Sequence, residues 1–209
     1  MCNLYKMTKP VQEVARLFDA IADPPGNAGE TVYPGYPGIV VAPDGASSAG
    51  GRGLRVRQMN WGFPLTLKGK NGQPLKPKPV NNCRTDKLDS FMWRHSFHER
   101  RCLIPVTAFC EAEGEKGAKT RTWFSLPDAE LFAVAGIWRD TAEWGAAYSM
   151  VMTEACEHVA GVHDRMPAIL PREDWADWLD GPPDAAELLC RPYELGMRVE
   201  RTGEAWVRR

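Results

Sequence analysis

A close series of strand-like segments in the middle of the chain constrains the fold more than any other feature. Four apolar or alternating runs follow one another at Cys102–Cys110, Thr122–Leu126, Leu131–Trp138 and Tyr148–Met152. No helical segments alternate with these runs, so the βαβ rhythm of a doubly wound sheet is missing. The sequence therefore predicts an α+β fold with a mixed, barrel-like β-sheet core flanked by short helices.

Other segments add outer elements to this core. Thr8 is predicted to cap a helix that has Pro10 in its first turn, carries Ile21 and ends before Pro24. Further strands are predicted at Ile39–Val41, Leu54–Arg57 and Met197–Arg201, with a turn region from Pro43 to Gly53 and a Gly/Pro/Lys loop from Lys68 to Lys78. Further helices are predicted at Asp86–Phe97 (with Leu88, Phe91 and Met92 on one side), Glu154–Ala160, Pro171–Leu179 and Asp184–Cys190.

Length and composition describe an ordinary globular chain. With 209 residues, 44% of them hydrophobic, the chain can bury a sizeable core, and we expect one domain over residues 1–209. No apolar run reaches the roughly 18 residues of a membrane span, and the first residues do not resemble a secretory signal. We therefore expect a cytoplasmic protein that does not bind a membrane and whose six cysteines stay reduced.

The charge is distributed unevenly along the chain. Residues 51–104 carry 12 Lys/Arg against 3 Asp/Glu, a local net charge of +9, although the whole chain has a net charge of −1. Aromatic residues, Trp61 and Trp93 among them, are interleaved with these cations. Cations for phosphates beside rings for bases are typical of nucleic-acid binding, whereas a solvated basic face over core aromatics is the simpler interpretation.

Cys2 is the first residue that suggests chemistry. Removal of the initiator Met1 would leave a cysteine with a free α-amine, a 1,2-aminothiol. The two groups titrate near 7.7–8.0 and 8.5 in model compounds, so modest help from the fold would supply a neutral amine and a thiolate. Such a pair condenses with an aldehyde to a thiazolidine ring, or acts as an N-terminal nucleophile on an amide. The alternative is that Cys2 stands at this position by chance and has no chemical role.

Two residues suggest proton transfer. Glu111 continues the apolar run that ends at Cys110, and a carboxylate on a buried strand has a raised pKa, which suits general acid/base work. His163 lies in a short polar segment bounded by apolar residues, and histidine transfers protons at neutral pH. The alternatives are a strand that surfaces at Glu111 and a structural histidine.

Asn82-Cys83-Arg84 closes the Pro-rich loop with an amide and a guanidinium that could hold a polar substrate and a phosphate. Cys156, His158 and His163 are metal-ligand types, but no second cluster matches them, so we expect no metal. We find no phosphate-binding glycine loop and no hydrolase elbow, and we expect no cofactor.

The order of these motifs resembles the SOS response-associated peptidase (SRAP) family over most of the chain. The resemblance is carried by Met1-Cys2, Trp61-Gly62-Phe63-Pro64, Asn82-Cys83-Arg84, Arg101 to Pro105 leading to Phe109-Cys110-Glu111, Ala135 to Trp138, Thr153, and His163 to Pro167. It implies a single domain that binds single-stranded DNA and DNA junctions, and captures abasic sites through the N-terminal cysteine. It also implies that Met1 is first removed, in some members by the domain's own peptidase activity.

The resemblance also implies a role for each matching residue. Cys2 would be the nucleophile, Asn82 would hold the opened sugar and the α-amine region, Glu111 would move protons, and His163 would assist ring opening and closure. Arg84 would contact a phosphate, while Trp61 and Thr153 would line the site.

The chain departs from the family pattern at two positions that bear on DNA contacts. Leu4 stands where an arginine is usual, and Ala112 stands where an aromatic residue follows the glutamate. Arg55, Arg57 or Trp93 would have to compensate for the missing contacts. The leading hypothesis is thus a monomeric abasic-site sensor that crosslinks to DNA through Cys2. The alternatives are an N-terminal-cysteine peptidase or amidase that acts on peptides, and a non-covalent single-stranded DNA binder.

Overall fold

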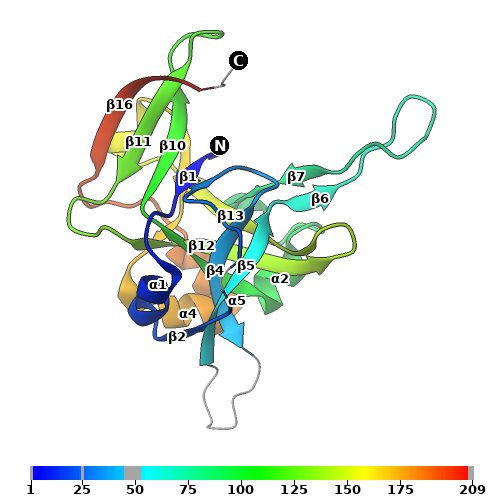
Figure 1. The fold of residues 1–209 in the computed structure, drawn as a ribbon, viewed down its shortest axis with the longest axis horizontal. Helices are drawn as coiled ribbons and strands as arrows, with labels where there is room; N and C mark the ends of the chain where they lie inside the picture. Colours follow the sequence, from blue (N-terminus) through cyan, green and yellow to red (C-terminus); the bar gives the residue numbers. More distant parts are fainter. Residues whose placement is uncertain (1, 25, 45–52, 207–209) are drawn as a thin grey trace.

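Five strands close into a barrel at the centre of the molecule (Figure 1). The computed structural model describes residues 2–24, 26–44 and 53–206, so Met1 and most of the turn region predicted from Pro43 to Gly53 lie outside the described residues. In order around the barrel, the strands are β5 (Gly53–Trp61), β4 (Pro37–Asp44), β9 (Arg101–Val106), β12 (Phe132–Thr141) and β13 (Gly145–Glu154). Neighbours pair antiparallel except β13 and β5, whose parallel pairing closes the ring. The predicted α+β fold with a mixed, barrel-like sheet is confirmed.

Short strands extend the barrel at its margins. The additions are β2 (Ala20–Ala22) on β5, β8 (Asn82–Arg84) and β14 (Arg165–Pro167) on β13, and β15 (Ile169–Leu170) on β12. Because β8 and β14 both pair with β13, the chain segments that contain Asn82 and His163 are brought to one end of that strand.

A second sheet packs beside the barrel and contains the start of the chain. Its strand order is β16 (Arg198–Ala205), β11 (Thr120–Ser125), β10 (Ala108–Glu113), β1 (Tyr5–Lys6) and β3 (Thr31–Val32). A separate hairpin of β6 (Phe63–Leu65) and β7 (Lys78–Val80) projects from the body in Figure 1. We call residues 63–80 the β6–β7 arm.

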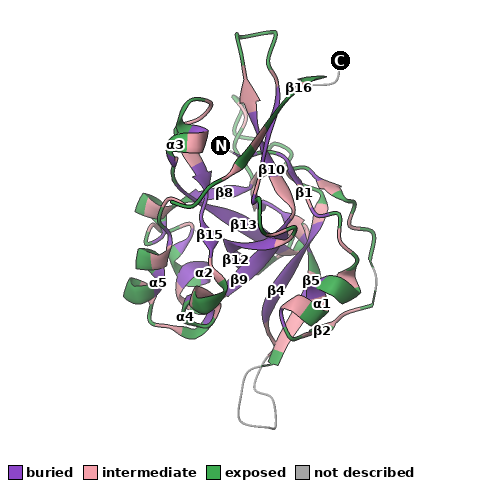
Figure 2. Ribbon diagram, turned by 90° about the vertical axis from the view of Figure 1, so that its left-hand side faces the viewer, coloured by how far each residue is buried: buried purple, intermediate pink, exposed green. Residues whose placement is uncertain are grey.

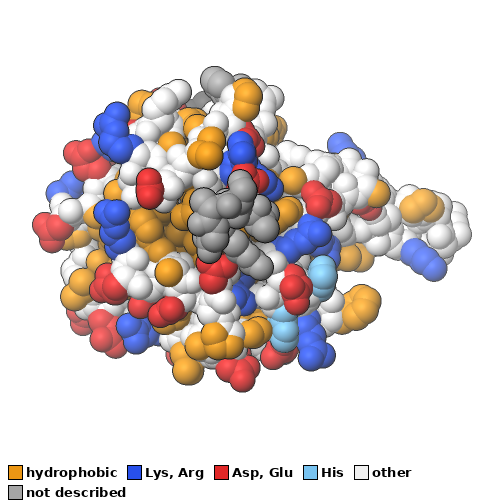
Figure 3. All heavy atoms as spheres, turned by 90° about the horizontal axis from the view of Figure 1, so that it is seen from below, with side chains coloured by type: hydrophobic (Ala, Val, Ile, Leu, Met, Phe, Trp, Pro, Cys, Tyr) orange, Lys and Arg blue, Asp and Glu red, His pale blue; other side chains and the backbone are white. Residues whose placement is uncertain are grey.

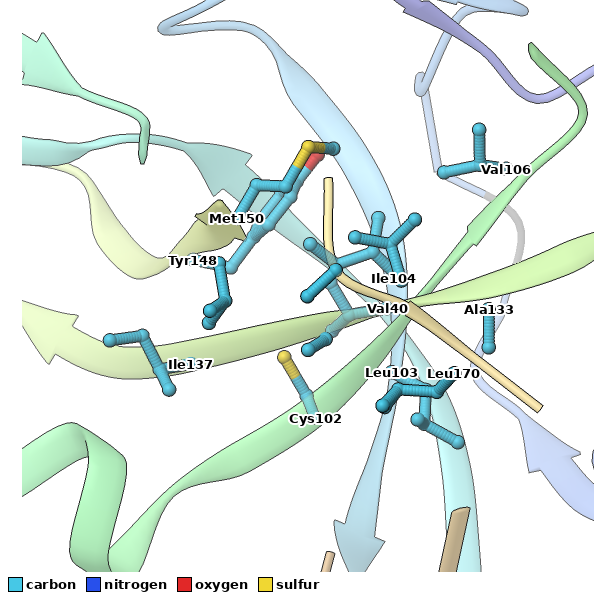
Figure 4. Close-up of a cluster of buried hydrophobic side chains, with 14 of the residues drawn as sticks. Val40, Cys102, Leu103, Ile104, Val106, Ala133, Ile137, Tyr148, Met150 and Leu170 are labelled. Carbon is cyan, nitrogen blue, oxygen red and sulfur yellow. The ribbon is translucent and has the colours of Figure 1, made fainter. Parts of the chain in front are cut away.

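The main core fills the barrel and the space beneath the helices. Every residue of β9 is buried, because the barrel covers one of its faces while α4 (Trp175–Asp180) and its neighbours cover the other. Figure 4 shows side chains of Ile104, Val40, Tyr148 and Met150 gathered inside the barrel. The helices α1 (Val11–Leu17), α2 (Arg94–Glu99), α3 (Glu157–Ala160) and α5 (Pro183–Leu189) each bury only one side, as Figure 2 shows. None of the described helices is long and apolar enough to cross a membrane.

The first predicted helix is shorter than expected. It begins at Val11 after Pro10, without a side-chain cap, and the Thr8 hydroxyl instead lies 3.5 Å from that of Thr107. The helix stops because Asp19 adopts a left-handed conformation (φ 49°), after which Ile21 is part of β2 rather than of a helix. The predicted helix over Asp86–Phe97 is also wrong in most of its length. A 3₁₀ turn at Thr85–Lys87 and further turns precede α2, and Phe91 is fully exposed.

The predicted strand from Cys102 to Cys110 is in fact two strands. The chain bends at Thr107, whose backbone N–H donates to the carbonyl of Lys6 (2.8 Å). The residues before the bend form β9 of the barrel, and those after it form β10 of the second sheet. This bend moves Glu111 out of the barrel wall and next to the start of the chain. The remaining predicted strands and the three predicted C-terminal helices are present, with shifted ends.

Candidate active site around Cys2

The carbonyl group of Cys2 is held by two asparagine side chains. Asn81 Nδ2 donates to the Cys2 oxygen at 2.9 Å, and Asn82 Nδ2 donates to the same oxygen at 2.7 Å. Asn81 Nδ2 also lies 3.1 Å from Asn3 Oδ1. Two donors on one carbonyl fix the direction in which residue 2 enters the fold.

The Asn81–Asn82 pair is itself rigidly placed. Asn82 lies on β8 opposite Met150, and the Met150 backbone N–H donates to the Asn81 carbonyl (2.9 Å). The indole Nε1–H of Trp61 donates to the same carbonyl at 3.0 Å. Asn82 Oδ1 is buried and accepts no hydrogen bond within the part of the chain that the structure describes. An open acceptor beside the Cys2 backbone is suited to an ammonium or hydroxyl group.

The Cys2 thiol is fully buried, and its Sγ lies 3.4 Å from the Leu4 carbonyl. Burial raises the pKa of this thiol well above its ordinary value, and the negative charge of nearby Glu111 raises it further. The expectation that the fold helps to form a thiolate is therefore wrong for the chain in this conformation. A protonated thiol has to lose its proton to a base when it reacts.

Glu111 is a buried carboxyl group whose charge acts on Cys2. The residue is 2% exposed, and burial raises its pKa to about 7, with the negative charge of Asp164 contributing to the rise. A carboxyl group with this pKa is present in both protonation states near neutral pH, which favours proton transfer in either direction.

His163 shares electrostatic surroundings with Glu111, since Asp164 and Lys119 act on both groups. The backbone N–H of Arg165 donates to His163 Nδ1 (3.0 Å), which leaves Nε2 to carry the proton of the neutral ring. Asp164 Oδ1 lies 2.9 Å from the same Nδ1 and favours the charged ring. Partial burial outweighs this effect and lowers the pKa of His163 below its ordinary value.

Arg84 and Thr153 lie together at the edge of this site. Arg84 follows Asn82 on β8, next to β13, which contains Thr153, and both residues line a polar cavity of about 870 Å³. Arg84 makes two 2.8 Å hydrogen bonds to Asp86, so a phosphate would compete with that carboxylate. Thr153 is buried.

The other residues predicted to contact DNA are either buried or paired with acidic side chains. Trp61 and Trp93 are buried, with Trp61 edge-on to Tyr5 (5.0 Å) and Trp93 against Phe63 (5.2 Å). Their rings therefore offer no face on which a base could stack.

Arg55 and Arg57 lie toward the other end of β5 and are paired with acids. Arg55 bonds to Asp44 (2.6 Å) and Asp23 (3.0 Å), and Arg57 bonds to Asp44 (2.7 Å). Figure 3 views this end of the molecule and shows acidic and basic side chains interspersed. Arg55 and Arg57 are thus paired with carboxylates and Trp93 is buried, and their compensating contact with DNA stays a prediction.

Sequence reasoning missed three residues of the site, Asn81, Lys119 and Asp164. The Asn81 side chain contacts a backbone carbonyl 79 positions away, which no local pattern encodes. The repeated Asn at 81 and 82 was the only signal. Across residues 2–24, 26–44 and 53–206, no group of three or more His, Cys, Asp or Glu side chains is arranged to hold a metal ion. All six cysteines are buried free thiols.

Solved structures share this architecture. A protein from Bordetella bronchiseptica matches with a TM-score of 0.78 and 22% identity, over 96% of this chain and 99% of the other. A protein from Bacteroides thetaiotaomicron matches with a TM-score of 0.75 and 20% identity, over 96% and 91% of the two chains. These likenesses establish the same fold.

The family model of the SOS response associated peptidase (SRAP) matches residues 1–203. The chain therefore belongs to the SRAP family, as its motifs predict.

Curated relatives carry names that describe abasic-site processing. The Bacillus subtilis abasic site processing protein YoqW is 28% identical over 155 residues, which cover 69% of this chain and 67% of the relative. The corresponding protein YoaM of the same organism is 23% identical over 93% of this chain and 87% of the relative. The Xenopus tropicalis abasic site processing protein HMCES is 24% identical over 65% of this chain, and the match spans about half of that longer relative.

Proposed function

We propose that this protein processes abasic sites in DNA by forming a covalent bond between Cys2 and the ring-opened sugar. The observation that carries the proposal is the clamped backbone of Cys2 beside a buried carboxyl group whose pKa is about 7. Membership in the SRAP family and the names of the relatives support the same substrate. The strand bound is proposed to be single-stranded DNA.

The chemistry needs Met1 to be removed, because the reacting group is the α-amine of Cys2. In the open form of an abasic sugar, C1′ is an aldehyde. The amine adds to this carbon and water leaves, which gives an imine. The thiol sulfur then adds to the same carbon while its proton passes to the imine nitrogen, which closes a thiazolidine ring. The net reaction is aldehyde plus aminothiol giving thiazolidine plus one water, with no redox change and no cofactor.

Asn81 and Asn82 act as positioning residues in this scheme. Their two hydrogen bonds to the Cys2 carbonyl hold the α-carbon, and therefore both the amine and the thiol, in one orientation. The buried Oδ1 of Asn82 is available to accept a hydrogen bond from the amine or from a sugar hydroxyl. Fixing both nucleophiles around one carbon supplies the rate advantage of an intramolecular reaction.

Glu111 is the proton carrier. Since the Cys2 thiol is held protonated by burial, the Glu111 carboxylate takes the thiol proton and returns it to nitrogen. The reverse transfer opens the ring again. His163, neutral because its pKa is lowered, assists the opening and closure of the sugar.

A denaturing gel tests the proposal directly. Purified protein is incubated with a labelled single-stranded oligonucleotide that carries an abasic aldehyde, with the intact oligonucleotide, and with one that carries a tetrahydrofuran analogue lacking the aldehyde. A shifted band is expected with the aldehyde alone. Cys2→Ala and Cys2→Ser both keep the α-amine but lack the thiol, so each should lose the band and give one only after borohydride reduction of the imine.

Intact-mass measurement of the crosslinking fraction should show the loss of Met1. The two alternative functions give different results. A peptidase would turn over peptides in trans and leave all three oligonucleotides unshifted. If the protein were a non-covalent binder, the Cys2→Ala variant would bind DNA as tightly as the wild type does. The wild type would then give no covalent band. Either result would overturn the proposal.

A further inference from the structure

A pocket of about 660 Å³ lies against the second sheet, next to the candidate active site. Its floor is Leu4, which belongs to a small apolar cluster with Cys110 and Trp123 that is separate from the main core. Trp206 packs against this cluster and also lines the pocket. The pocket is therefore built on its own apolar base rather than on the wall of the barrel.

Two tyrosines also line the pocket. Tyr33 and Tyr36 are 39% and 64% exposed, and their rings meet edge to face with centroids 6.3 Å apart. The turn between them is fixed, because the Gly35 backbone N–H donates to the Trp61 carbonyl (2.6 Å). Exposed rings held by an ordered backbone are suited to stacking against a flat ligand.

The pocket also contains a buried cation with an unused donor. Arg121 is 5% exposed and donates from Nη1 to Glu204 (2.9 Å). Its Nε–H is buried and has no hydrogen-bond partner in the part of the chain that the structure describes. A buried donor without a partner is unfavourable, and a ligand with an acceptor atom would satisfy it. A flat aromatic ligand with polar edges meets both requirements.

Asn3 connects this pocket to the candidate active site. It lies at the rim of the pocket, and its Oδ1 accepts from Asn81 Nδ2, the same group that holds the Cys2 carbonyl. A strand whose abasic nucleotide reached Cys2 would therefore pass the pocket with a neighbouring nucleotide.

We infer that this pocket binds a nucleobase of the same DNA strand, close to the abasic position. The inference rests on the proposed function, because it assigns a second contact to the strand held at Cys2. Tyr33 and Tyr36 stack on the base, and Arg121 donates to an acceptor on its edge. Alanine substitution at a stacking position weakens binding by about 5- to 150-fold per base.

Fluorescence of 2-aminopurine tests the inference without any covalent step. Each single-stranded oligonucleotide of a set carries a tetrahydrofuran analogue at the centre and a single 2-aminopurine. Across the set, the 2-aminopurine occupies in turn each of the three positions on either side of the analogue. With wild-type protein, emission should change at one of these positions. Tyr33→Ala/Tyr36→Ala should lose that change and bind about 5- to 150-fold more weakly. Tyr33→Phe/Tyr36→Phe keeps the rings and should retain both properties.

Phe91→Ala is the matched control, because it removes a fully exposed ring elsewhere and should leave emission and affinity unchanged. The inference is overturned if no position responds, or if the double alanine variant binds and responds as the wild type does. Failure of the proposed function looks different. In that case the aldehyde oligonucleotide gives no covalent band, whereas the 2-aminopurine response still reports whether the pocket holds a base.

Discussion

The candidate active site and the basic stretch of residues 51–104 use charged groups in opposite ways. In the site, Glu111 is buried and its pKa is raised to about 7. In the basic stretch, most of the described cations are exposed or half-exposed, and Arg55 and Arg57 are neutralised by Asp23 and Asp44. Function in the site should therefore depend on pH and on single atoms, whereas DNA attraction should depend on salt and on how many cations remain unpaired.

The basic stretch is divided as well. The β6–β7 arm carries four exposed lysines, Lys68, Lys70, Lys76 and Lys78, and no acidic residue. None of the ion pairs found among the described residues involves these lysines. The arm begins after Trp61 and ends before Asn81, so its base lies at the active site (Figure 1). The basic stretch thus contains a segment whose arginines are paired with acids and an arm whose lysines make no ion pair among the described residues.

Glu111→Gln gives the largest expected effect. The substitution keeps the amine and the thiol but removes the proton carrier, so crosslinking to the abasic aldehyde should slow by about 10²–10⁴-fold. The high reactivity of an aminothiol with an aldehyde favours the lower end of that range. The reverse reaction, followed by release of the oligonucleotide from purified crosslink, should slow as well. If Glu111→Gln matched the wild type in both directions while His163→Ala abolished both, the proton carrier would be His163.

The same substitution should change how stability depends on pH. Because the folded-state pKa of Glu111 is raised, the folded protein binds the Glu111 proton more tightly than the unfolded chain does. The wild type should lose up to about 3 kcal/mol of stability from this group as pH rises from 4.5 to 7, and no more above that. Glu111→Gln should not show this loss, so its stability relative to the wild type should rise over that interval. Urea unfolding at pH 5 and pH 8 measures the difference, and an equal gap at both values would contradict the assignment.

The arm should dominate the salt dependence of DNA binding. Changing all four arm lysines to Gln should reduce the slope of log affinity against log salt for single-stranded DNA by about 3, since each phosphate contact contributes about 0.7. Between 50 and 200 mM salt this corresponds to about a 50-fold smaller loss of affinity. Arg16→Gln/Arg172→Gln removes two exposed cations from the opposite side of the molecule and should leave the slope unchanged. An arm variant with the wild-type slope would show that the arm is only a solvated hairpin.

Much of the fold and part of the site could be predicted from local sequence. Strand patterns predicted the barrel because its strands contain apolar or alternating runs, as in β9 and β5. The run that ends at Cys110 pointed to Glu111 as a buried carboxylate for the same reason. The bend at Thr107 was not predictable, because an apolar run reads the same whether it stays in one sheet or passes to a second.

The features that were missed are contacts between distant positions. The bond from Asn81 to Cys2 and the ion pairs of Arg55 and Arg57 join segments that only the closed barrel and its neighbouring sheet bring together. The net charge of a sequence segment gives no sign of such pairing. The burial of Trp61 and Trp93 follows the same logic, since aromatic residues among cations have the same sequence pattern in a core as on a binding surface.

The smallest expected effect is that of Arg55→Gln/Arg57→Gln on DNA binding. Both guanidinium groups are already committed to Asp44, and Arg55 also to Asp23, so few counterions are released when DNA approaches them. The slope against salt should therefore change by less than about half a unit, against about 3 for the arm. The pKa of Asp44, which its hydrogen bonds with Arg55 hold below the ordinary value, should instead rise toward that value in the variant. NMR titration of the Asp44 carboxyl group measures this rise. A slope that falls by one unit or more in this variant, with the Asp44 pKa unchanged, would mean that the arginines leave their acids to bind phosphate, and the division of the basic stretch into two regions would fail.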